Sequence, residues 1–305
     1  MDNYLINLYN ERKLDYKNIS FKKTNEVSGS HVTFSIIIPV MNRVTFHKPL
    51  VHHLKAAAMY LRNHSTGLYK DVTFSITFVE HSHEDKHSHL ARTSGVNHIW
   101  IPKERDEPFN KCMAMNMGAL YSNSADYYLF HDIDLLMHWG FFLKILQNFK
   151  KYSNVGALQT FGGRRVVYMD EVLSHNVITE QFSLDEAIRD FQKSMTYSKP
   201  GAPGGSICVK SKNFFNVGGY DAEFFHSYSP EDRFFWRKLE YTCGIQGCDD
   251  PLLESYHMWH PSMVGTNPDG PAMEEIMNKL ENELEIHHKM NYIYHVAKNF
   301  KRFTQ

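Results

Sequence analysis

Short apolar runs alternate with amphipathic segments along the first half of the chain. The apolar runs are typical of buried strands, and two of the segments between them carry apolar residues at helical spacing. Strands that alternate with helices predict an α/β fold with a mostly parallel sheet and helices on both faces. Ligands of such sheets bind beyond the carboxyl ends of the strands. We expect strands at 32–38 (stopped by Pro39), 72–79, 97–101 and 127–130, and helices at 49–61 and 109–121.

The second half of the chain has a less regular pattern. We expect a helix at 139–149, a strand at 155–160, and a helix or a mobile lid within 170–200. A tight glycine-rich turn follows at 200–205.

The C-terminal segment 272–300 is predicted to be an amphipathic helix that packs on the domain rather than on a membrane. Its apolar residues fall on two different faces, so the helix is expected to break or change direction near Glu285. One face carries Ile276, Leu280 and Leu284, and the other carries Ile286, Met290 and Ile293.

Two aspartates interrupt the apolar segment 127–137. Asp132 and Asp134 directly follow a predicted buried strand. Aspartate is depleted in strands, and an unpaired buried carboxylate is costly. A divalent cation that carries phosphate oxygens would compensate both carboxylates, because Mg²⁺ and Mn²⁺ prefer oxygen ligands. A solvated turn at the end of the strand is the alternative.

The composition excludes several classes of protein. The 305 residues have a formal net charge of −1, so no overall field attracts nucleic acid or anionic membranes. The four cysteines form no zinc-binding spacing, and reduced thiols are the favoured interpretation. The phosphate-loop pattern is absent. No apolar signal region or membrane-length apolar run occurs, so a complete chain of this sequence is expected to be soluble and cytoplasmic, without a membrane span.

Residues 80–89 form a polar tract that is rich in histidine. Histidines two and four residues apart could chelate a second metal ion. The tract, however, lacks the apolar neighbours that orient metal ligands. A solvated loop near the end of the second strand is therefore the favoured interpretation.

Six blocks of the chain, in the same order, resemble inverting glycosyltransferases of the GT-A fold. The resemblance is strongest to the β-1,4-galactosyltransferase family (family seven) and extends to family two. It includes the Asp-x-Asp motif, a Phe-Asn-Lys helix, a Gly-Gly block and a Glu-Asp block. The blocks lie at 34–43, 109–118, 131–135, 204–220, 229–237 and 256–260.

The resemblance implies a metal-dependent donor site. Asp134 would be the first ligand of Mn²⁺ (or Mg²⁺), with His260 and His257 as further ligands, and Asp132 would lie nearer the ribose or the outer shell of the metal. Donor-binding residues would be Pro39, Val40, Asn42, Arg43, Asn110, Lys111, Asp132, Gly204 and Gly205.

The same resemblance implies the catalytic residues. Asp232 would be the base that deprotonates the acceptor hydroxyl, and Glu231 would bind donor or acceptor hydroxyls. A helix N-terminus enriched in acidic residues explains this pair equally well as structure. Tyr228 falls where the family has an acceptor-stacking tryptophan, but the surrounding motif differs and the stretch from Asp134 to Gly204 is longer. The acceptor therefore cannot be inferred.

The sequence thus predicts an N-terminal extension at 1–30, a GT-A catalytic domain at 31–265 and a helical segment at 266–305. The predicted reaction transfers a hexose or N-acetylhexosamine from UDP-Gal, UDP-GalNAc or UDP-GlcNAc to a hydroxyl of a glycan or glycoconjugate, as in polysaccharide biosynthesis, with possible peripheral association at a membrane face. A nucleotidyltransferase on a related fold and a glycan-binding module that has lost catalysis are the alternatives.

Overall fold

A seven-stranded sheet forms the centre of the computed structural model, which describes residues 31–64, 71–122, 125–160, 166–197, 204–261 and 267–288. The strand order is β10-β6-β9-β4-β1-β2-β3, and β9 is antiparallel to both of its neighbours. The other described pairs in this sheet are parallel, which confirms the predicted fold class. The strands are β1 (His31–Val40), β2 (Asp71–Ser82), β3 (Asn97–Pro102), β4 (Tyr127–His131), β6 (Ala157–Gln159), β9 (Ser206–Lys210) and β10 (Ile245–Gly247).

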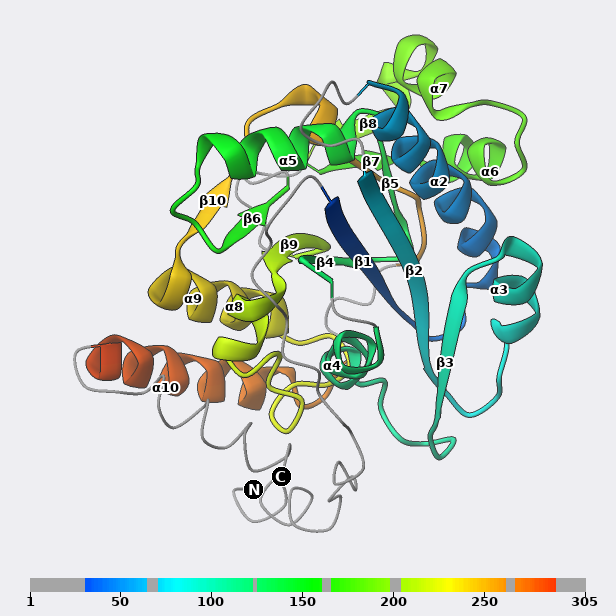
Figure 1. The fold of residues 1–305 in the computed structure, drawn as a ribbon. Helices are drawn as coiled ribbons and strands as arrows, with labels where there is room; N and C mark the ends of the chain where they lie inside the picture. The colour runs from blue at the N-terminus through cyan, green and yellow to red at the C-terminus, as the bar shows by residue number, and fades with distance from the viewer. Residues whose placement is uncertain are drawn as a thin grey trace.

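Helices cover both faces of this sheet (Figure 1). On one face lie α2 (His47–His64) and α5 (Phe141–Lys151), and on the other lies α4 (Lys111–Tyr121), with α8, α9 and α10 beside it. The remaining helices are η2 (Val44–Phe46), α3 (Ser88–Ser94), α6 (Glu171–Ile178), α7 (Leu184–Asp190), η3 (Gln192–Ser194), α8 (Ser211–Asn216), α9 (Glu231–Cys243), η4 (Pro251–Leu253) and α10 (Gly270–His288).

Side chains of β1 alternate between two hydrophobic cores. Phe34, Ile36 and Ile38 belong to the core under α2 and α5, whereas Ile37 belongs to the core that includes α4 and α9. This alternation follows from the two-residue period of a strand. A strand buried on both faces therefore appears in the sequence as a continuous apolar run.

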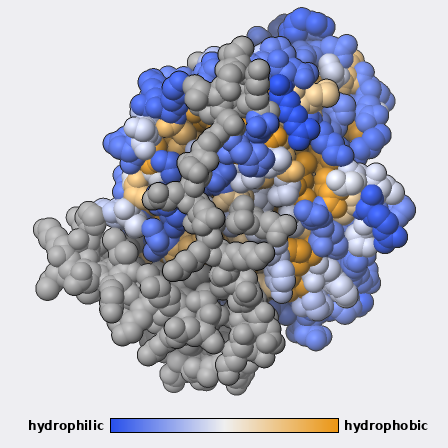
Figure 2. All heavy atoms as spheres, in the orientation of Figure 1, coloured by the Kyte–Doolittle hydropathy of each residue, from blue (hydrophilic) through white to orange (hydrophobic). Residues whose placement is uncertain are grey.

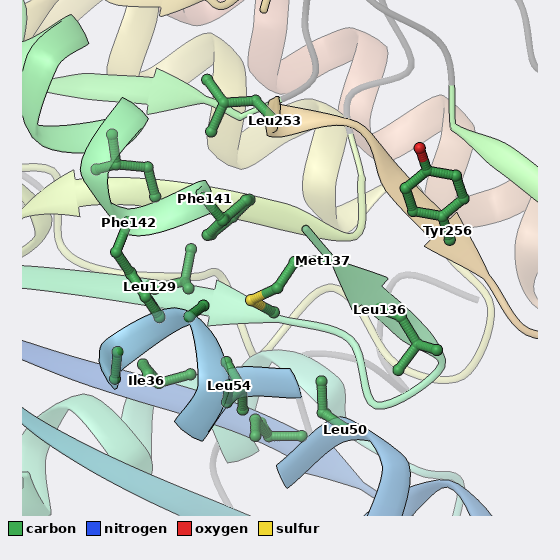
Figure 3. Close-up of a cluster of buried hydrophobic side chains, with 14 of the residues drawn as sticks. Ile36, Leu50, Leu54, Leu129, Leu136, Met137, Phe141, Phe142, Leu253 and Tyr256 are labelled. Atoms are coloured by element: carbon green, nitrogen blue, oxygen red, sulfur yellow. The ribbon is translucent and has the colours of Figure 1, made fainter. Parts of the chain in front are cut away.

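A second, four-stranded sheet extends the first core. Its order is β5-β11-β7-β8, with β5 (Leu135–Met137), β11 (Ser255–His257), β7 (Val167–Met169) and β8 (Met195–Tyr197). Figure 3 shows Leu136 and Met137 of β5 in one cluster with Leu50 and Leu54 of α2, and Tyr256 of β11 belongs to the same core. These three-residue strands are too short to show a period, so the sequence did not indicate this sheet.

The end of β1 differs from the prediction that Pro39 stops the strand. Pro39 lies within β1, opposite Val79 of β2. On its other side β1 pairs with β4 only as far as Ile37. The missing N–H of Pro39 therefore removes no ladder bond on that side.

The histidine-rich tract is only in part the solvated loop that was predicted. Residues 83–86 are exposed and lie outside helices and strands, but strand β2 continues to Ser82, and Glu80, His81, Ser82 and His87 are buried. The end of β2 is buried because β3 pairs with it as far as Ser82.

Residues 170–197 are partly helical, as predicted. Leu173 and Val177 of α6 and Leu184 and Ala187 of α7 are buried in the first core. The predicted turn at 200–205 is described only from Gly204 onward, and residues 161–165 lie outside the described part of the chain.

The C-terminal helix packs on the domain, as predicted, and its partner there is α9. Met273 and Met277 of α10 are buried, and Leu280 of the predicted face is half-buried, whereas Leu284 lies among residues whose side chains are not described. The helix is unbroken at Glu285 and continues to His288, and residues 289–300 of the predicted helix lie outside the described part of the chain.

On the face shown in Figure 2, hydrophilic residues predominate over α7 and the outer turns of α2, and apolar colour is confined to narrow areas between elements. Within the described ranges, no helix is both long and apolar enough to cross a membrane.

Candidate active site

Three possible metal-ligating side chains lie close together: those of Asp134, His257 and His260. The Oδ1 atom of Asp134 lies 3.8 Å from His257 Nε2, and its Oδ2 atom lies 3.1 Å from His260 Nε2. One ligand atom from each residue falls within 4.8 Å of the others. The structure thus brings together the three residues that the sequence predicts as metal ligands.

Backbone pairing explains how residues more than a hundred positions apart meet. Asp134 lies in the turn between β4 and β5, and His257 ends β11, opposite Leu135 of β5. The amide of Met258 donates a hydrogen bond to the carbonyl of Asp134 (2.8 Å). The second sheet therefore fixes the carboxylate and the histidine segment relative to each other.

The imidazole of His131 holds the same turn through two polar contacts. This buried ring donates from Nε2 to the carbonyl of Leu135 (3.0 Å), and its Nδ1 lies 2.9 Å from Ser206 Oγ on β9. Burial lowers the pKa of His131 to about 4, so this ring is neutral at physiological pH. Sequence reasoning assigned no role to His131, although it is part of the Asp-x-Asp block.

The charges around Asp134 favour its ionised form. Burial alone would raise the pKa of Asp134, but the hydrogen bond from His260 and the charges of His257 and Arg43 hold it well below its usual range. The hydrogen bond to Asp134 raises the pKa of His260, whereas burial lowers the pKa of His257.

The donor set suits a divalent transition metal. One carboxylate and two imidazoles favour Mn²⁺ over Mg²⁺. His260 Nδ1 lies 2.8 Å from the carbonyl of Pro261, an arrangement that orients the ring and leaves Nε2 for a metal. These three residues could therefore hold a manganese ion.

Arg43 also reaches this cluster. Its guanidinium forms an ion pair with Asp134 and lies 3.4 Å from His260 Nδ1. The sequence predicts Arg43 in the wall that binds uridine and phosphate, and the structure places it against the metal-ligand candidates themselves.

Glu231 and Asp232 begin helix α9. The first turn of a helix stabilises carboxylates through the helix dipole. Asp232 lies against Gly204, where an added Cβ would be 2.6 Å from Asp232 Oδ2, so this contact requires glycine. Gly205 adopts a φ of +88°, which also favours glycine.

Lys111 joins the two acidic motifs. Its Nζ atom lies 3.0 Å from Asp132 Oδ1, 3.0 Å from Asp232 Oδ2 and 3.4 Å from Glu231 Oε1. Burial would lower the pKa of Lys111, but these carboxylates raise it well above its usual value. A small pocket beside Lys111 is lined by both Asp132 and Asp232.

The carboxyl groups of this cluster titrate differently from isolated ones. Burial, followed by the charge of Asp232, raises the pKa of Glu231 to about 7. Burial also raises the pKa of Asp132 to about 6, although Lys111 opposes the shift.

Other predicted donor residues lie near this edge but have local partners. Val40 packs in the core, so a contact with the donor could come only from its backbone. Asn110 caps helix α4, since its Oδ1 accepts from the amide of Met113 (2.8 Å), and its Nδ2 donates to the carbonyl of Ala222 (2.8 Å). Asn42 is exposed, and Pro39 is buried in β1.

Tyr228, the predicted acceptor residue, is 54 % exposed. Tyr168 of β7 was not predicted. Its ring centroid lies 4.8 Å from that of His257, and it is 40 % exposed. Burial raises the pKa of Tyr168, and the charges of Tyr228 and Asp134 raise it further. An exposed aromatic residue in a three-residue strand carries no sequence signal that could have identified it.

Solved structures with the same architecture include several glycosyltransferases. The 1–349 region of S. aureus TarS has a TM-score of 0.52 at 12% identity, over 89% of this chain and 71% of that chain. The catalytic domain of Drosophila β1,4-galactosyltransferase 7, in complex with xylobiose, has a TM-score of 0.49 at 14% identity, over 81% and 79% of the two chains. Glucosyl-3-phosphoglycerate synthase from Mycobacterium tuberculosis, in complex with Mn²⁺, UDP-glucose and phosphoglyceric acid, has a TM-score of 0.45 at 13% identity, over 84% and 79%.

No protein-family model matches the chain, and no curated protein matches it. At the identities of the solved structures, the similarity to TarS shows a shared fold, which is the GT-A fold. What the chain does must therefore be argued from its site.

Proposed function

We propose that the chain is a metal-dependent, inverting glycosyltransferase that uses a UDP-sugar. The observation that carries this proposal is the position of Lys111 between Asp132 of the Asp-x-Asp motif and the Glu231-Asp232 pair. A cluster of possible metal ligands and the acids Glu231 (buried) and Asp232 (half-buried) would thereby belong to one continuous site. Glycosyl transfer needs both a stabilised leaving group and a base.

The metal-ligand candidates would hold the donor. Asp134, His257 and His260 would bind Mn²⁺, which when bound neutralises charge on the departing diphosphate. Arg43, in contact with Asp134, lies where its guanidinium could also bind a phosphate oxygen.

Asp232 would act as the base. As the acceptor oxygen bonds to C1 of the sugar, the bond from C1 to the diphosphate oxygen breaks, and UDP leaves with the electron pair. The proton of the acceptor hydroxyl passes to the carboxylate of Asp232, and attack opposite the leaving group inverts the anomeric centre. Lys111 Nζ, 3.0 Å from Asp232 Oδ2, would hold this carboxylate in place.

The substrates follow from the resemblance and the related folds. A UDP-hexose or UDP-N-acetylhexosamine is the proposed donor, and a hydroxyl of a glycan or glycoconjugate is the proposed acceptor. Tyr228 and Tyr168 would offer aromatic faces to an acceptor sugar. The identity of the sugar and the linkage stay open.

Turnover of UDP-sugars tests the proposal. Wild-type protein with Mn²⁺ should release UDP from UDP-Gal, UDP-GalNAc or UDP-GlcNAc, faster when an acceptor is present. The Asp232→Asn variant should lose about 10²–10⁴-fold in kcat, because the base is removed, and it should still bind UDP. As the matched control, Asp190→Asn removes a carboxylate that is exposed on α7 and should leave kcat unchanged.

Two results would contradict the proposal. If Asp232→Asn turned over as fast as wild type, Asp232 would not be the base. If pyrophosphate rather than UDP were released, the site would belong to a nucleotidyltransferase.

A further inference from the structure

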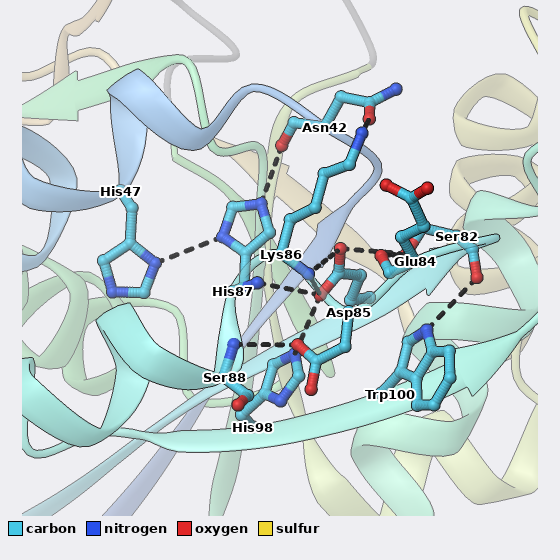
Figure 4. A network of polar contacts seen from close by, with 11 residues as sticks. Asn42, His47, Ser82, Glu84, Asp85, Lys86, His87, Ser88, His98 and Trp100 are labelled. Atoms are coloured by element: carbon cyan, nitrogen blue, oxygen red, sulfur yellow. Dashed lines mark hydrogen bonds and ion pairs between the residues drawn. The ribbon is translucent and has the colours of Figure 1, made fainter.

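The loop between β2 and α3, which carries Glu84, Asp85 and Lys86 in Figure 4, is built around the buried carboxylate of Glu80. Its Oε1 atom accepts from Ser82 Oγ (2.9 Å) and from the amide of Lys86 (3.1 Å). Its Oε2 atom accepts from the amide of His87 (3.1 Å) and lies 3.1 Å from His98 Nε2. One side chain thus folds the whole loop 82–87 back onto the end of its own strand.

This arrangement does not favour a second metal site. Glu80, Asp85 and His98 are close enough to share an ion. An ionised carboxylate offers about four acceptor positions, however, and backbone amides, Ser82 and His98 use those of Glu80. A metal could bind only by displacing hydrogen bonds that hold the loop.

The loop reaches across to the segment that follows β1. His87 Nε2 donates a hydrogen bond to the carbonyl of Asn42 (2.7 Å), and Lys86 Nζ donates to Asn42 Oδ1 (2.7 Å). Behind His87, its Nδ1 lies 3.3 Å from Nδ1 of the buried His47 on α2. Figure 4 shows His87 between Asn42 and His47.

Asn42 and Arg43 have an unfavourable backbone conformation. Their φ angles are +60° and +52°, and neither residue is glycine. A non-glycine residue keeps this conformation only where neighbouring contacts stabilise it. Asparagine tolerates this region better than arginine, so Arg43 gains most from a neighbour that is held in place.

The left-handed turn directs Arg43 into the candidate site. The Arg43 side chain forms an ion pair with Asp134 and lies 3.4 Å from His260 Nδ1. The path from Glu80 through His87 and Asn42 to Arg43 therefore consists of consecutive contacts. It ends at a side chain in the site, although Glu80 and His87 contact none of the metal-ligand candidates in the contacts described.

We propose that His87, held by Glu80, is a positioning residue that fixes the turn at Asn42–Arg43 and thereby places the Arg43 guanidinium for the diphosphate of the donor. The role of Arg43 toward the diphosphate rests on the proposed function. The role of His87 in fixing the turn is independent of it.

Variants of His87 and Lys86 separate positioning from folding. His87→Leu removes the hydrogen bond to Asn42, whereas His87→Gln can keep an N–H donor at a similar reach. Lys86→Met removes the second contact from an exposed side chain, so it leaves the core intact. His83→Ala, an exposed histidine of the same loop, is the matched control.

Two measurements decide the proposal. Hydrogen exchange at residues 41–46 should be about tenfold faster in His87→Leu, near wild type in His87→Gln and unchanged in His83→Ala, as loss of one hydrogen bond implies. With Mn²⁺ present, UDP should bind roughly tenfold more weakly to His87→Leu, while Mn²⁺ alone binds as to wild type, because its ligands are untouched.

Some results would overturn it. Unchanged exchange at 41–46 in a folded His87→Leu variant, or in Lys86→Met if His87→Leu does not fold, would exclude the positioning role. Unchanged UDP affinity in either variant would exclude its link to the donor. If the wild-type protein bound no UDP, both the proposed function and the role of Arg43 toward the diphosphate would be excluded. The hydrogen-exchange rates would still decide whether His87 holds the turn.

Discussion

At the scale of single residues, Lys111 has the most unusual surroundings in the candidate site. It is 14 % exposed and lies within 3.4 Å of three carboxylates from two different motifs. Buried carboxylates without a cation would repel one another and bind protons. We therefore infer that Lys111 offsets the repulsion between these carboxylates and holds the pKa of Glu231 below the value that burial alone would give.

Replacing Lys111 by Met should move the pH profile of turnover to higher pH. In wild type the acidic limb should rise through about pH 7, because burial raises the pKa of Glu231 to about 7. The positive charge of Lys111 lowers that pKa, so its loss raises it, and ionised Glu231 forms only at higher pH. The measurement is kcat/KM against pH with a fixed donor.

Lys111→Arg keeps the charge and is the control for this profile. Its midpoint should stay near that of wild type even if its rate is lower. A midpoint that does not move in Lys111→Met would show that Lys111 does not set the ionisation of Glu231.

The resemblance predicted the charged residues and glycines of the candidate site, but not the contacts between them. Asp134, His257 and His260 occur in short motifs with distinctive side chains, and the structure places them together. The contact of Arg43 with Asp134 depends on a left-handed turn that is held by a distant histidine. A local pattern cannot show such a contact, because its partners come from separate strands.

At the scale of elements, the turn before β9 and the second sheet shape the site. Gly204 touches Asp232, and β5 and β11 carry Asp134 and His257 at their ends. Long, periodic elements such as α2 and β1 were predicted, since each buries a continuous face. The three-residue strands β5, β7, β8 and β11 were not, because tertiary pairing rather than local pattern forms them.

Gly204→Ala should reduce turnover without unfolding the protein. The added Cβ would lie 2.6 Å from Asp232 Oδ2, so the base must shift from its position beside Lys111. We expect a loss of about tenfold or more in kcat, as small displacements at a reacting centre produce. Gly270→Ala, where nothing lies within 4 Å of the new Cβ, should turn over as wild type does. Equal kcat in both variants would argue against Asp232 as the base.

Leu136→Ala should destabilise the second sheet. Leu136 is fully buried in β5, and its truncation leaves a cavity that costs about 2–5 kcal/mol in the free energy of unfolding. Val172→Ala on α6, which is 70 % exposed, should change it by less than about 0.5 kcal/mol. Denaturant unfolding measures both, and a loss in Leu136→Ala no greater than in Val172→Ala would mean that β5 is not part of the cooperative core.

At the scale of the whole molecule, the fold joins segments that are remote in sequence into one site. Arg43, Lys111, Asp134, Asp232 and His260 come from the loops and helix starts around one edge of the sheet. A ligand that bridges these segments binds the folded chain and not the unfolded one. Its binding should therefore stabilise the entire molecule.

Mn²⁺ should raise the thermal stability of the wild-type protein. At a hundredfold excess over its Kd, a single site adds about 2.7 kcal/mol to the free energy of unfolding. His260→Ala should lose most of this increase, whereas His89→Ala, an exposed histidine on α3, should keep it. A stabilisation by Mn²⁺ that persisted in His260→Ala would place the metal elsewhere.

Calorimetric titration of UDP into the wild-type protein, with saturating Mn²⁺ and again with a chelator, tests the central claim most directly. The account predicts one UDP site per chain that binds at least about tenfold more tightly with Mn²⁺, because a cation held by Asp134, His257 and His260 would neutralise charge on the diphosphate. Absence of UDP binding, or binding of equal strength with and without the metal, would contradict it.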